Sequence, residues 1–584
     1  MLLAHILSAL LMLAPADSAL FSQETKNHVH TFLEEYLDVR AASRNYRQII
    51  ETQKEDGSFP GVDYKSDRRT NWPAMKHLRN MTTLACAWKC SGDPKALKAY
   101  RRALSFWVEA HPVSLNWWFN EVAVPKEFGP AALLIREDFS PDDLERAISI
   151  FDNVDRRLED ATGRNMIWVA GNMLMRDLLK EDAAGLRRDR DLMAGEVKIV
   201  EYADGIQPDW TFHQHGSQLQ IGNYGLGFAS SLCLWNKALS GTHLQFPGEK
   251  MDIIRNYVSE CQLWMVWGGY YDFSACGRLM GVDKQKKNAD LVADCARQLG
   301  LDGASPKGSK YYPYSDYAVY RASDWYASLR MQSNRVIGFE CINQNNMKGY
   351  FSSDGALLVR REGDEYENIA PCLNWKHIPG ATTYDDRIPL WGVEAEKPYN
   401  RTDLVFGQAE GDYMAAAMEL NRDGLSARKA WFFTPGAIIC LGAGISMDRK
   451  YEVVTALGQC ALKGEVNSGR NWVSHRGVSY VMLDKSKIRI SAPDHAGQWR
   501  YLDPSYSDKE VHMDLFDAYI SHGKAPSDAS YAYAVIPTGV SGAEAQAWTA
   551  ENVTVLENTP DIQQVRVGNM VLTVCWNNAE ITIE

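Results

Sequence analysis

A polar segment between residues 207 and 224 contains the side chains best suited to acid–base chemistry. Asp209, His213, His215 and Tyr224 lie close together there. A histidine titrates near neutral pH, and a tyrosine hydroxyl can accept or donate a proton, so the segment offers a base and an acid. The two histidines could instead bind a metal, although no third ligand is obvious nearby, or both could be structural.

An aromatic run and an arginine loop could supply the binding side of such a site. Asn116-Trp117-Trp118 begins a polar loop that ends at Pro125. Aromatic faces exposed in a loop suit the C–H faces of sugar rings, although both tryptophans could equally fill a helical core. Arg278 ends an aromatic-rich loop, where its guanidinium could hold a carboxylate or form a surface salt bridge.

Helices must position these segments, because the N-terminal half of the chain has helical periodicity. Ser140-Pro141 predicts a helix start with a capping hydroxyl and a proline in the first turn. Apolar residues then recur three and four apart from Leu144 to Leu158, which predicts one apolar stripe. Further helices are predicted at 27–53, 94–109, 165–180, 249–266 and 288–299, with loops at 113–130 and 203–226.

The pattern changes after about residue 325, where short alternating or β-branched runs replace the helical periodicity. Residues 335–355 are by themselves typical of a strand and a turn. A hairpin with a two-residue turn is predicted at Gly568-Asn569. Many short strands with Gly, Asp and Asn turns indicate an antiparallel sandwich, connected to the helices through residues 301–330.

The composition is that of a large globular chain. It has 584 residues, 45% hydrophobic and 23% charged, which excludes a disordered or fibrous protein and predicts at least two domains. The net charge of −12 disfavours a nucleic-acid binder, so no nucleic-acid partner is expected. The eleven cysteines show no zinc-finger or small-domain disulfide spacing, and disulfides are not predicted to stabilise the fold.

The only membrane-length apolar stretch lies at the start of the chain. Residues 2–14 resemble the apolar part of a signal peptide, are followed by small residues and are short for a membrane span. No Lys or Arg precedes them, so a buried N-terminal helix is the alternative. We expect a signal peptide over 1–19 and a secreted or periplasmic protein without a membrane span.

In chain order, the polar segments resemble motifs of polysaccharide lyase family 8, which includes hyaluronate, chondroitin AC and xanthan lyases. The family pattern Asn-Trp-Trp-x-x-Glu-Ile-Gly-x-Pro is similar to residues 116–125, and Thr-Gly-x-Asn is similar to 162–165. Asp-Gly-Ser-Phe-x-Gln-His, followed by a later Tyr, is similar to 209–224. The family's Gly-Arg loop resembles 277–278, and the opening of its central sheet domain resembles 335–380.

The resemblance implies an α+β multidomain chain, with an α/α toroid followed by antiparallel β-sandwich domains. The expected toroid covers residues 20–325 and the β-sandwich region covers 326–584. Val282 stands where the family usually has a second arginine, four residues after Arg278, and Lys284 or Lys286 could replace its charge. Changes from the family pattern beside the second histidine indicate a remodelled cleft.

The resemblance also implies β-elimination on a uronic-acid polysaccharide, in which the C5 proton is removed, the C4 oxygen leaves and a 4,5-unsaturated sugar remains. That proton is weakly acidic because charge would develop beside a carboxylate. The resemblance assigns neutralisation of this carboxylate to Asn165, assisted by His215. Tyr224 would carry the proton, with Arg278 favouring its phenolate. For an epimeric uronate, His215 would be the base and Tyr224 the acid.

The remaining roles concern orientation and binding. Glu340 would orient Arg278 or His215, and the chain of sugars would contact the residues Asn116, Trp117, Trp118 and Asn343. A local basic lining could offset the negative net charge of the chain, from Lys126, Arg164, Arg278 and Arg335. The scheme implies no metal and no cofactor, and its partner is an acidic polysaccharide, for which chondroitin or hyaluronan is favoured.

Two alternatives remain open at this stage. A glycoside hydrolase on an α/α toroid would need two carboxylates flanking the bond, and Glu121 and Asp209 are the available pair. The chain could also be a polysaccharide-binding protein without turnover, which the loss of arginine at Val282 would favour.

Overall fold

The structure is a computed structural model that describes residues 20–385 and 399–584. The predicted signal peptide, residues 1–19, lies outside the described residues. The chain divides into two compact units, which we describe one at a time. Unit 1 comprises the described residues up to Lys198 together with Phe228–Ile254, and unit 2 comprises Ile199–Gly227 and Arg255–Glu584. Within the described ranges, every helix is too short or too polar to cross a lipid bilayer.

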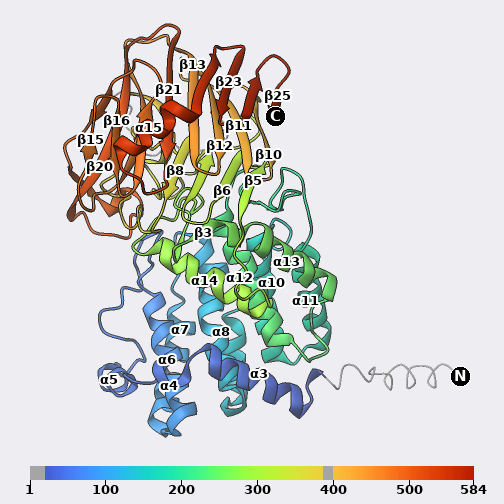
Figure 1. The fold of residues 1–584 in the computed structure, drawn as a ribbon. Helices are drawn as coiled ribbons and strands as arrows, with labels where there is room; N and C mark the ends of the chain where they lie inside the picture. Colours follow the sequence, from blue (N-terminus) through green and yellow to red (C-terminus); the bar gives the residue numbers. More distant parts are fainter. Residues whose placement is uncertain (1–19, 386–398) are drawn as a thin grey trace, which may run out of the picture. The chain divides into compact units, whose positions relative to one another are not determined.

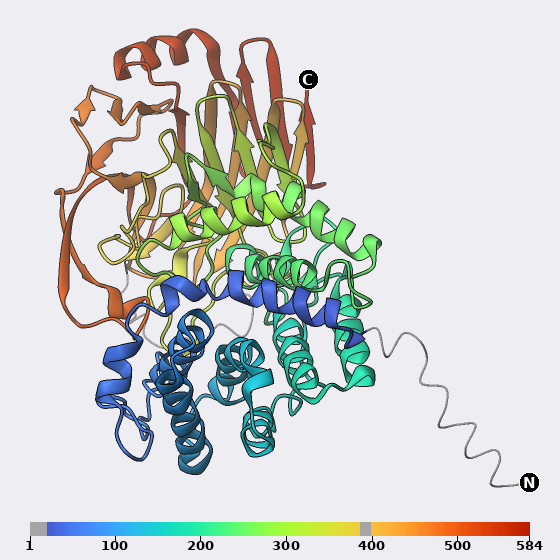
Figure 2. The same ribbon diagram turned by 90° about the horizontal axis from the view of Figure 1, so that it is seen from below.

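Unit 1 is built from helical hairpins. Helix α6 packs against α7 and α10 packs against α11, while α6, α8 and α10 also pack side by side as one layer (Figure 1). Helix α3 packs on α8 and runs across its neighbours (Figure 2). The helices are α3 (Gln23–Tyr36), α4 (Val39–Ala42), α5 (Tyr46–Thr52), α6 (Met75–Ser91), α7 (Pro94–Ala110), α8 (Val124–Leu134), α9 (Pro141–Ser149), α10 (Arg164–Lys180), α11 (Ala183–Glu196) and most of α12 (Leu226–Leu239) and α13 (Gly248–Glu260).

The predicted cap at Ser140 is confirmed, but the helix that follows is shorter than predicted. The Ser140 hydroxyl accepts from the Asp143 N–H, the Asp143 carboxylate accepts from the Ser140 N–H, and α9 ends at Ser149. Phe151 and Val154 remain buried, yet they lie in a series of turns. Asp and Asn side chains between them favour such turns over a continued helix.

The predicted loop over 113–130 is wrong in its second half. A π-helical turn, η1 (Phe119–Ala123), leads directly into α8. Pro125 lies in the first turn of α8, where the backbone N–H has no helical partner and a proline is tolerated. The proline therefore starts a helix here and does not end a loop.

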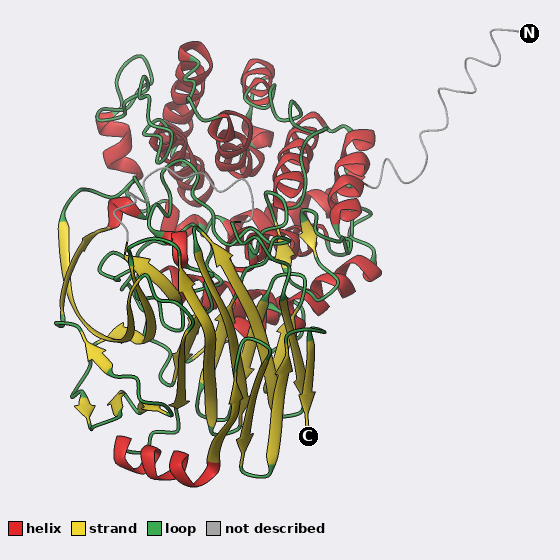
Figure 3. Cartoon of the chain, turned by 90° about the horizontal axis from the view of Figure 1, so that it is seen from above, coloured by secondary structure: helices red, strands yellow, loops and turns green. Residues whose placement is uncertain are grey.

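Unit 2 is dominated by antiparallel sheets. A central eight-stranded sheet has the order β10-β11-β12-β13-β21-β17-β16-β15. A five-stranded sheet joins β9, β14, β18, β19 and β20, and two four-stranded sheets are formed by β5–β8 and by β22–β25. Figure 3 shows these strands, with α15 (Gly542–Asn552) at one end of them. Unit 2 also contains α14 (Lys284–Gln298) and four two-residue strands, which are β1 (Gly205–Ile206), β2 (Phe212–His213), β3 (Val266–Trp267) and β4 (Tyr270–Tyr271).

The strands of these sheets are between two and fifteen residues long. The central sheet consists of β10 (Val405–Glu410), β11 (Tyr413–Arg422), β12 (Leu425–Thr434), β13 (Ala437–Met447), β15 (Asn467–Ser468), β16 (Trp472–His475), β17 (Val478–Met482) and β21 (Ala529–Ile536). The others are β5 (Gly308–Tyr312), β6 (Tyr317–Arg321), β7 (Tyr326–Arg330), β8 (Ala356–Arg360), β9 (Thr382–Asp385), β14 (Glu452–Ala461), β18 (Ile488–Ile490), β19 (Asp494–Gln498), β20 (Glu510–Lys524), β22 (Val553–Asn558), β23 (Ile562–Val567), β24 (Met570–Cys575) and β25 (Glu580–Ile583).

The central sheet is buried on both faces. In β11, Met414 and Ala416 pack into a core shared with β5–β8, β14 and β20, whereas Ala415 and Ala417 pack into a second core shared with β22–β25. Successive side chains of a strand point to opposite faces, so two buried faces require an unbroken apolar run. This explains why β11 is apolar over consecutive residues.

Two sequence predictions for the sheets have different outcomes. The hairpin at Gly568-Asn569 is confirmed, since Val567 pairs with Met570 across that two-residue turn. Strands β5 and β6 precede residue 325, the expected end of the helical domain. The prolines and glycines of residues 301–330 predict a connection without regular structure. Instead, the aromatic and β-branched residues between these prolines and glycines form the paired strands β5 and β6.

Candidate active site

Four predicted site residues contact one another in unit 2. Arg278 donates from Nη2 to the Tyr224 hydroxyl over 3.0 Å and from Nη1 to one carboxylate oxygen of Glu340. The other oxygen of Glu340 lies against His215 Nδ1. The His215 and Tyr224 rings are 4.8 Å apart in an edge-to-face arrangement. We call His215, Tyr224, Arg278 and Glu340 the Glu340 cluster.

Glu340 is the hub of this cluster. Its side chain is 1% exposed, and besides His215 and Arg278 it accepts a hydrogen bond of 2.6 Å from Gln220 Nε2. Burial by itself would raise the pKa of Glu340, but the His215 hydrogen bond and the Arg278 charge lower it below the ordinary value. Glu340 is therefore an ionised acceptor that fixes its three donors.

The Glu340 carboxylate affects the pKa of Arg278 and the position of the proton on the His215 ring. Burial by itself would lower the pKa of Arg278, but the Glu340 and Tyr224 charges raise it, so the guanidinium stays charged. A carboxylate only accepts hydrogen bonds, so His215 Nδ1 carries the proton in this contact. The Nε2 atom of a neutral His215 is then an acceptor, and this side chain is 31% exposed.

The backbone around His215 and Tyr224 is irregular. His215 has a φ of 62°, in the left-handed region that ordinary residues seldom adopt. The Asp204 carboxylate holds this turn by accepting from the Gly216 N–H over 2.9 Å. Tyr224 lies in a π-helical turn, η3 (Ile221–Gly225), a feature that is frequent at functional sites.

Glycine lets the Arg278 loop approach the turn that carries Tyr224. Gly277 has a φ of 70°, and a Cβ atom added there would lie 2.8 Å from Gln220 Oε1. The buried Arg330 then ties the Arg278 and Glu340 loops together, since it donates to the Ser274 and Gly338 carbonyls over 2.9 and 2.7 Å. Packing and backbone hydrogen bonds thus fix the cluster from several segments.

Asn343 follows Glu340 on the same loop and is exposed. It has a φ of 52°, and Gln344 beside it has a φ of 64°, so the loop turns sharply. Asn346 closes the turn by donating from Nδ2 to the Glu340 carbonyl over 3.0 Å. The amide of Asn343 is therefore available to a ligand close to Glu340 in the chain.

The other predicted site residues lie in unit 1. Asn165 is the second residue of α10, whose N-terminal end carries a partial positive charge, and its side chain is partly exposed. Asn116 donates from Nδ2 to the Arg69 carbonyl over 2.9 Å and accepts from the Trp118 N–H over 3.1 Å. These residues are placed by unit 1, whereas the Glu340 cluster is placed by unit 2.

Tryptophan rings and arginine side chains contact one another in unit 1, at the loop that contains Asn116. Trp117 is 36% exposed, and the Arg157 guanidinium lies 4.5 Å from its ring centre. Trp118 meets Trp168 edge to face at 5.5 Å, and the Arg164 guanidinium lies 4.3 Å from the Trp168 ring. We call these five residues the tryptophan cluster. It offers aromatic faces together with positive charge.

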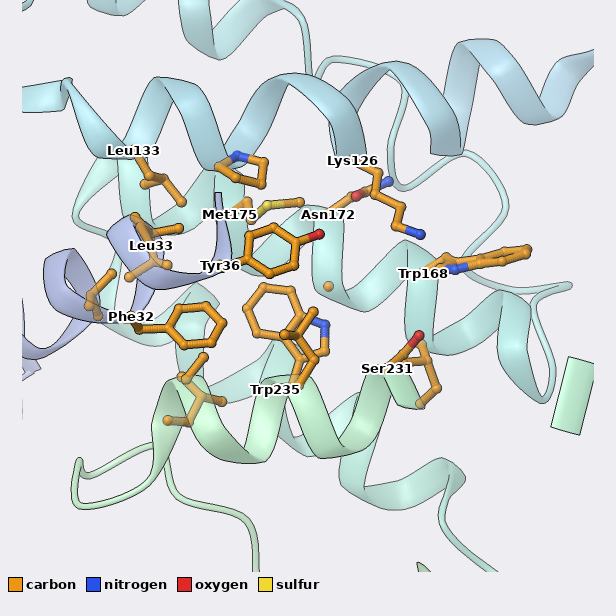
Figure 4. A pocket seen from close by; sticks show the side chains of 18 of the residues that line it. Phe32, Leu33, Tyr36, Lys126, Leu133, Trp168, Asn172, Met175, Ser231 and Trp235 are labelled. Atoms are coloured by element: carbon orange, nitrogen blue, oxygen red, sulfur yellow. The ribbon is translucent and has the colours of Figure 1, made fainter. Parts of the chain in front are cut away.

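A cavity of about 140 Å³ lies beside this cluster in unit 1 (Figure 4). Helices α3, α8, α10 and α12 line it with mostly apolar side chains. Lys126 and Trp168 lie at one end, and burial together with the Arg164 charge lowers the pKa of Lys126 to about 8. None of the nine predicted site residues lines this cavity.

Some residues considered from the sequence have structural roles. His213 is buried and hydrogen-bonds Ser315 over 2.9 Å, and burial lowers its pKa to about 3. Asp209 accepts from the Thr211 N–H and the Tyr314 N–H. Across residues 20–385 and 399–584, no three His, Cys, Asp or Glu side chains form a group that could hold a metal ion. His213 and His215 therefore belong to no such group among those residues.

Two further charged residues that the sequence suggested for the site form ion pairs within the protein. Arg335 donates to the Asp403 carbonyl and pairs with Asp316 at 3.3 Å. Glu121, the other carboxylate of the hydrolase alternative, pairs with Arg157 at 3.0 Å.

Gln220 is a site residue that the sequence analysis missed. It is fully buried between the sequence positions of His215 and Tyr224, and it donates to Glu340. A polar amide at a position where the segment must be buried was the available signal. Asp204 and Arg330, which hold the surrounding loops, gave no comparable signal because they bond backbone groups of loops, whose geometry the residue types do not reveal.

Comparisons with known proteins agree with this architecture. Residues 17–300 match the polysaccharide lyase family 8 N terminal alpha-helical domain, and residues 307–548 match the family's super-sandwich domain. Chondroitinase-AC from Pedobacter heparinus is 31% identical, over 95% of this chain and 86% of that protein. Xanthan lyase from Bacillus sp. GL1 is 23% identical, over 77% of this chain and 57% of that protein.

Solved structures give the same result for the fold. A chondroitinase AC lyase studied as oligosaccharide complexes superposes with a TM-score of 0.86 and 28% identity, covering 94% of this chain and 89% of that chain. Chondroitin AC lyase from Streptomyces coelicolor A3, at 21% identity, superposes with a TM-score of 0.83, covering 95% and 86% of the two chains. The expected α/α toroid and antiparallel β-sandwich are thereby confirmed. The chain belongs to polysaccharide lyase family 8 and is a polysaccharide lyase.

Proposed function

We propose that this lyase cleaves a uronic-acid glycosaminoglycan, chondroitin or hyaluronan, by β-elimination to give 4,5-unsaturated products. The observation that carries the proposal is the Arg278–Tyr224–His215–Glu340 contact network, which joins a proton carrier, a cation and an imidazole. The 31% identity to a chondroitinase-AC over nearly the whole chain supports chondroitin. Hyaluronate and xanthan lyases match at lower identity.

Tyr224 is the proposed proton carrier. Its hydroxyl accepts from Arg278 over 3.0 Å, and a guanidinium at this distance stabilises the phenolate that must remove the C5 proton. The same oxygen would then protonate the departing C4 oxygen. A positioned acid–base group of this kind accounts for about 10²–10⁴-fold in rate.

His215 and Asn165 are the proposed donors to the uronate carboxylate. Removing the C5 proton places negative charge on that group, and preorganised donors lower the free energy of this state. Glu340 fixes the His215 ring through Nδ1 and leaves Nε2 to the substrate. To donate to the uronate carboxylate, His215 must carry a proton on both ring nitrogens, and the Glu340 carboxylate stabilises that imidazolium. For an epimeric uronate, Nε2 would accept the C5 proton and Tyr224 would act as the acid.

The proposed binding residues are Asn116, Trp117, Trp118 and Asn343. The exposed ring of Trp117 and the edge-to-face pair of Trp118 with Trp168 provide apolar faces for sugar rings. A polymer of this kind is met outside the cell, and we propose that the protein is secreted or periplasmic.

The experiment is a polymer panel. The protein is incubated with chondroitin, hyaluronan, alginate and xanthan, and unsaturated ends are followed by ultraviolet absorption while reducing ends are counted in parallel. The proposal expects both signals to rise together on chondroitin or hyaluronan. New reducing ends without ultraviolet absorption would show hydrolysis and contradict it, as would exclusive action on alginate or xanthan.

A further inference from the structure

One segment of unit 2 is fixed to both loops that carry the Glu340 cluster. Residues 499–506 begin with a single 3-10 turn, η6 (Trp499–Tyr501). The Val282 N–H, on the Arg278 loop, donates to the Tyr506 hydroxyl over 3.0 Å. On the Glu340 loop, the Asn346 and Met347 N–H groups donate to the carbonyls of this segment, over 2.8 and 2.9 Å. The segment therefore adjoins both loops.

Its side chains present aromatic faces. Trp499 and Tyr506 lie with ring centres 5.6 Å apart at an angle of 31°, and both are partly exposed. Tyr501 is also partly exposed, and the Lys348 ammonium lies 5.3 Å from its ring centre. Leu502, in the same segment, is buried in the hydrophobic core of unit 2. The segment thus carries three partly exposed rings, and the Lys348 ammonium from the Glu340 loop lies against one of them.

Lys348 has no counter-charge in the described chain. Across residues 20–385 and 399–584, no carboxylate lies within ion-pair distance of its ammonium group, which contacts the Tyr501 ring instead. Burial lowers its pKa, so holding the charge there has a free-energy cost that an anionic ligand would offset. An unpaired, partly buried cation beside aromatic faces fits an acidic sugar.

The neighbouring lysines do not supply the same unpaired charge. Trp499 shares a small hollow with Lys284 and Lys286, but Asp283 and Glu367 line the same hollow and balance the two charges. Val282, on the loop between them and Arg278, is exposed and apolar. Among the described residues of these loops, Lys348 is therefore the partly buried cation that no carboxylate pairs, while Arg500 in the segment is exposed.

We infer that Trp499, Tyr501, Tyr506 and Lys348 form a further substrate subsite, in which the rings pack on a sugar and the ammonium pairs with its carboxylate or sulfate. The inference rests on the proposed function, because the subsite adjoins the loops of the Glu340 cluster. It extends that function by assigning a second acidic sugar of the polymer to the β-sheet unit.

The test compares Lys348→Gln with Lys348→Arg and with Lys487→Gln, an exposed lysine outside these three loops. We expect Lys348→Gln to raise KM about tenfold with kcat within twofold, as for loss of one charged hydrogen bond. Lys348→Arg keeps the charge and should keep KM within about threefold. An unchanged KM in Lys348→Gln, or an equal rise in Lys487→Gln, would overturn the subsite.

Two polymers identify the anionic group. If Lys348 pairs with the carboxylate, KM rises equally on hyaluronan, which has no sulfate, and on chondroitin sulfate; a rise on chondroitin sulfate alone assigns it to the sulfate. The Kd for oligosaccharides of these two polymers, measured by calorimetry, separates a failure of the subsite from a failure of the proposed function. A wild-type protein that forms no unsaturated ends contradicts the function, whereas a Kd unchanged by Lys348→Gln contradicts the subsite.

Replacing an aromatic ring gives a second, independent test. Trp499→Leu removes the ring and keeps an apolar side chain, and we expect KM to rise about fivefold with kcat unchanged, the effect of one aromatic contact. Thermal unfolding midpoints within a few degrees of wild type would show that the fold is intact. A folded Trp499→Leu variant with wild-type KM would overturn the role of the ring.

Discussion

The Glu340 cluster of unit 2 and the tryptophan cluster of unit 1 hold their side chains in different ways. In the first, a side chain only 1% exposed accepts from three donors, so each member is fixed by directional hydrogen bonds. In the second, guanidinium groups lie over rings at 4.3 and 4.5 Å and two tryptophan rings meet edge to face at 5.5 Å, while Trp117 remains 36% exposed.

This difference separates chemistry from binding. Proton transfer needs atoms held to a few tenths of an ångström, which a charged hydrogen-bond network provides. Stacking on a sugar tolerates lateral movement, which aromatic faces allow. Substitutions in the Glu340 cluster should therefore lower kcat, whereas substitutions in the tryptophan cluster should raise KM.

The largest effect is expected for Tyr224→Phe. The variant keeps the ring and its contact with His215 but loses the oxygen that accepts from Arg278, so kcat should fall about 10³-fold or more. Affinity for oligosaccharides, measured by calorimetry, should stay within about threefold. Tyr202→Phe, a tyrosine outside the cluster, is the matched control, and a Tyr224→Phe enzyme that keeps a tenth of the wild-type kcat would refute the assignment.

Glu340→Gln should lower kcat about 10²-fold and also destabilise unit 2. It removes the charge that Arg278 and His215 face, and breaking a buried ion pair costs about 3–5 kcal/mol in the free energy of unfolding. Urea unfolding of both proteins measures the difference.

The contribution of Glu340 to the free energy of unfolding should decrease as the pH falls. The folded pKa of Glu340 lies below its ordinary value of 4.5, so its contribution is complete above pH 4.5 and is lost as pH falls through the folded pKa. The difference between wild type and Glu340→Gln should therefore shrink below that pH. A constant difference down to pH 3 would mean that the charge is not the cause.

Gln220→Leu should have an intermediate effect. It removes one hydrogen bond to the Glu340 carboxylate while conserving volume, and the expected fall in kcat is about tenfold with a smaller change in KM. Because Gln220 acts through Glu340, the pH profile of kcat should shift as well. Gln218→Leu, at another buried glutamine of the same segment, is the matched control.

The smallest effect is expected in unit 1. Trp117→Ala should raise KM about fivefold and leave kcat within twofold, because it removes a stacking face and no proton carrier. Arg156→Gln, beside Arg157 but exposed, controls for surface charge. A kcat loss in Trp117→Ala as large as that in Gln220→Leu would contradict the division between the two clusters.

Much of the fold followed from local patterns. Helical periodicity located α7 and α10 closely, and the hairpin at Gly568-Asn569 formed as predicted, because such patterns depend on neighbouring residues. The pattern misled where a residue type has two roles. The pattern predicts that Pro125 ends a loop, whereas Pro125 begins α8. The prolines around β5 and β6 are typical of a connection, whereas paired strands form between them.

The sequence alone determined the family motifs, the residue types of the site and the order of helices before strands, because these depend on spacing along one chain. Tertiary structure decided which groups meet. Only folding brings Glu340, more than a hundred residues after His215, against that ring. Only folding shows that Gln220 supports it and that, among residues 20–385 and 399–584, no carboxylate pairs with Lys348. Such contacts depend on burial and on distance in space, and neither can be read from the residues that neighbour a position in the sequence.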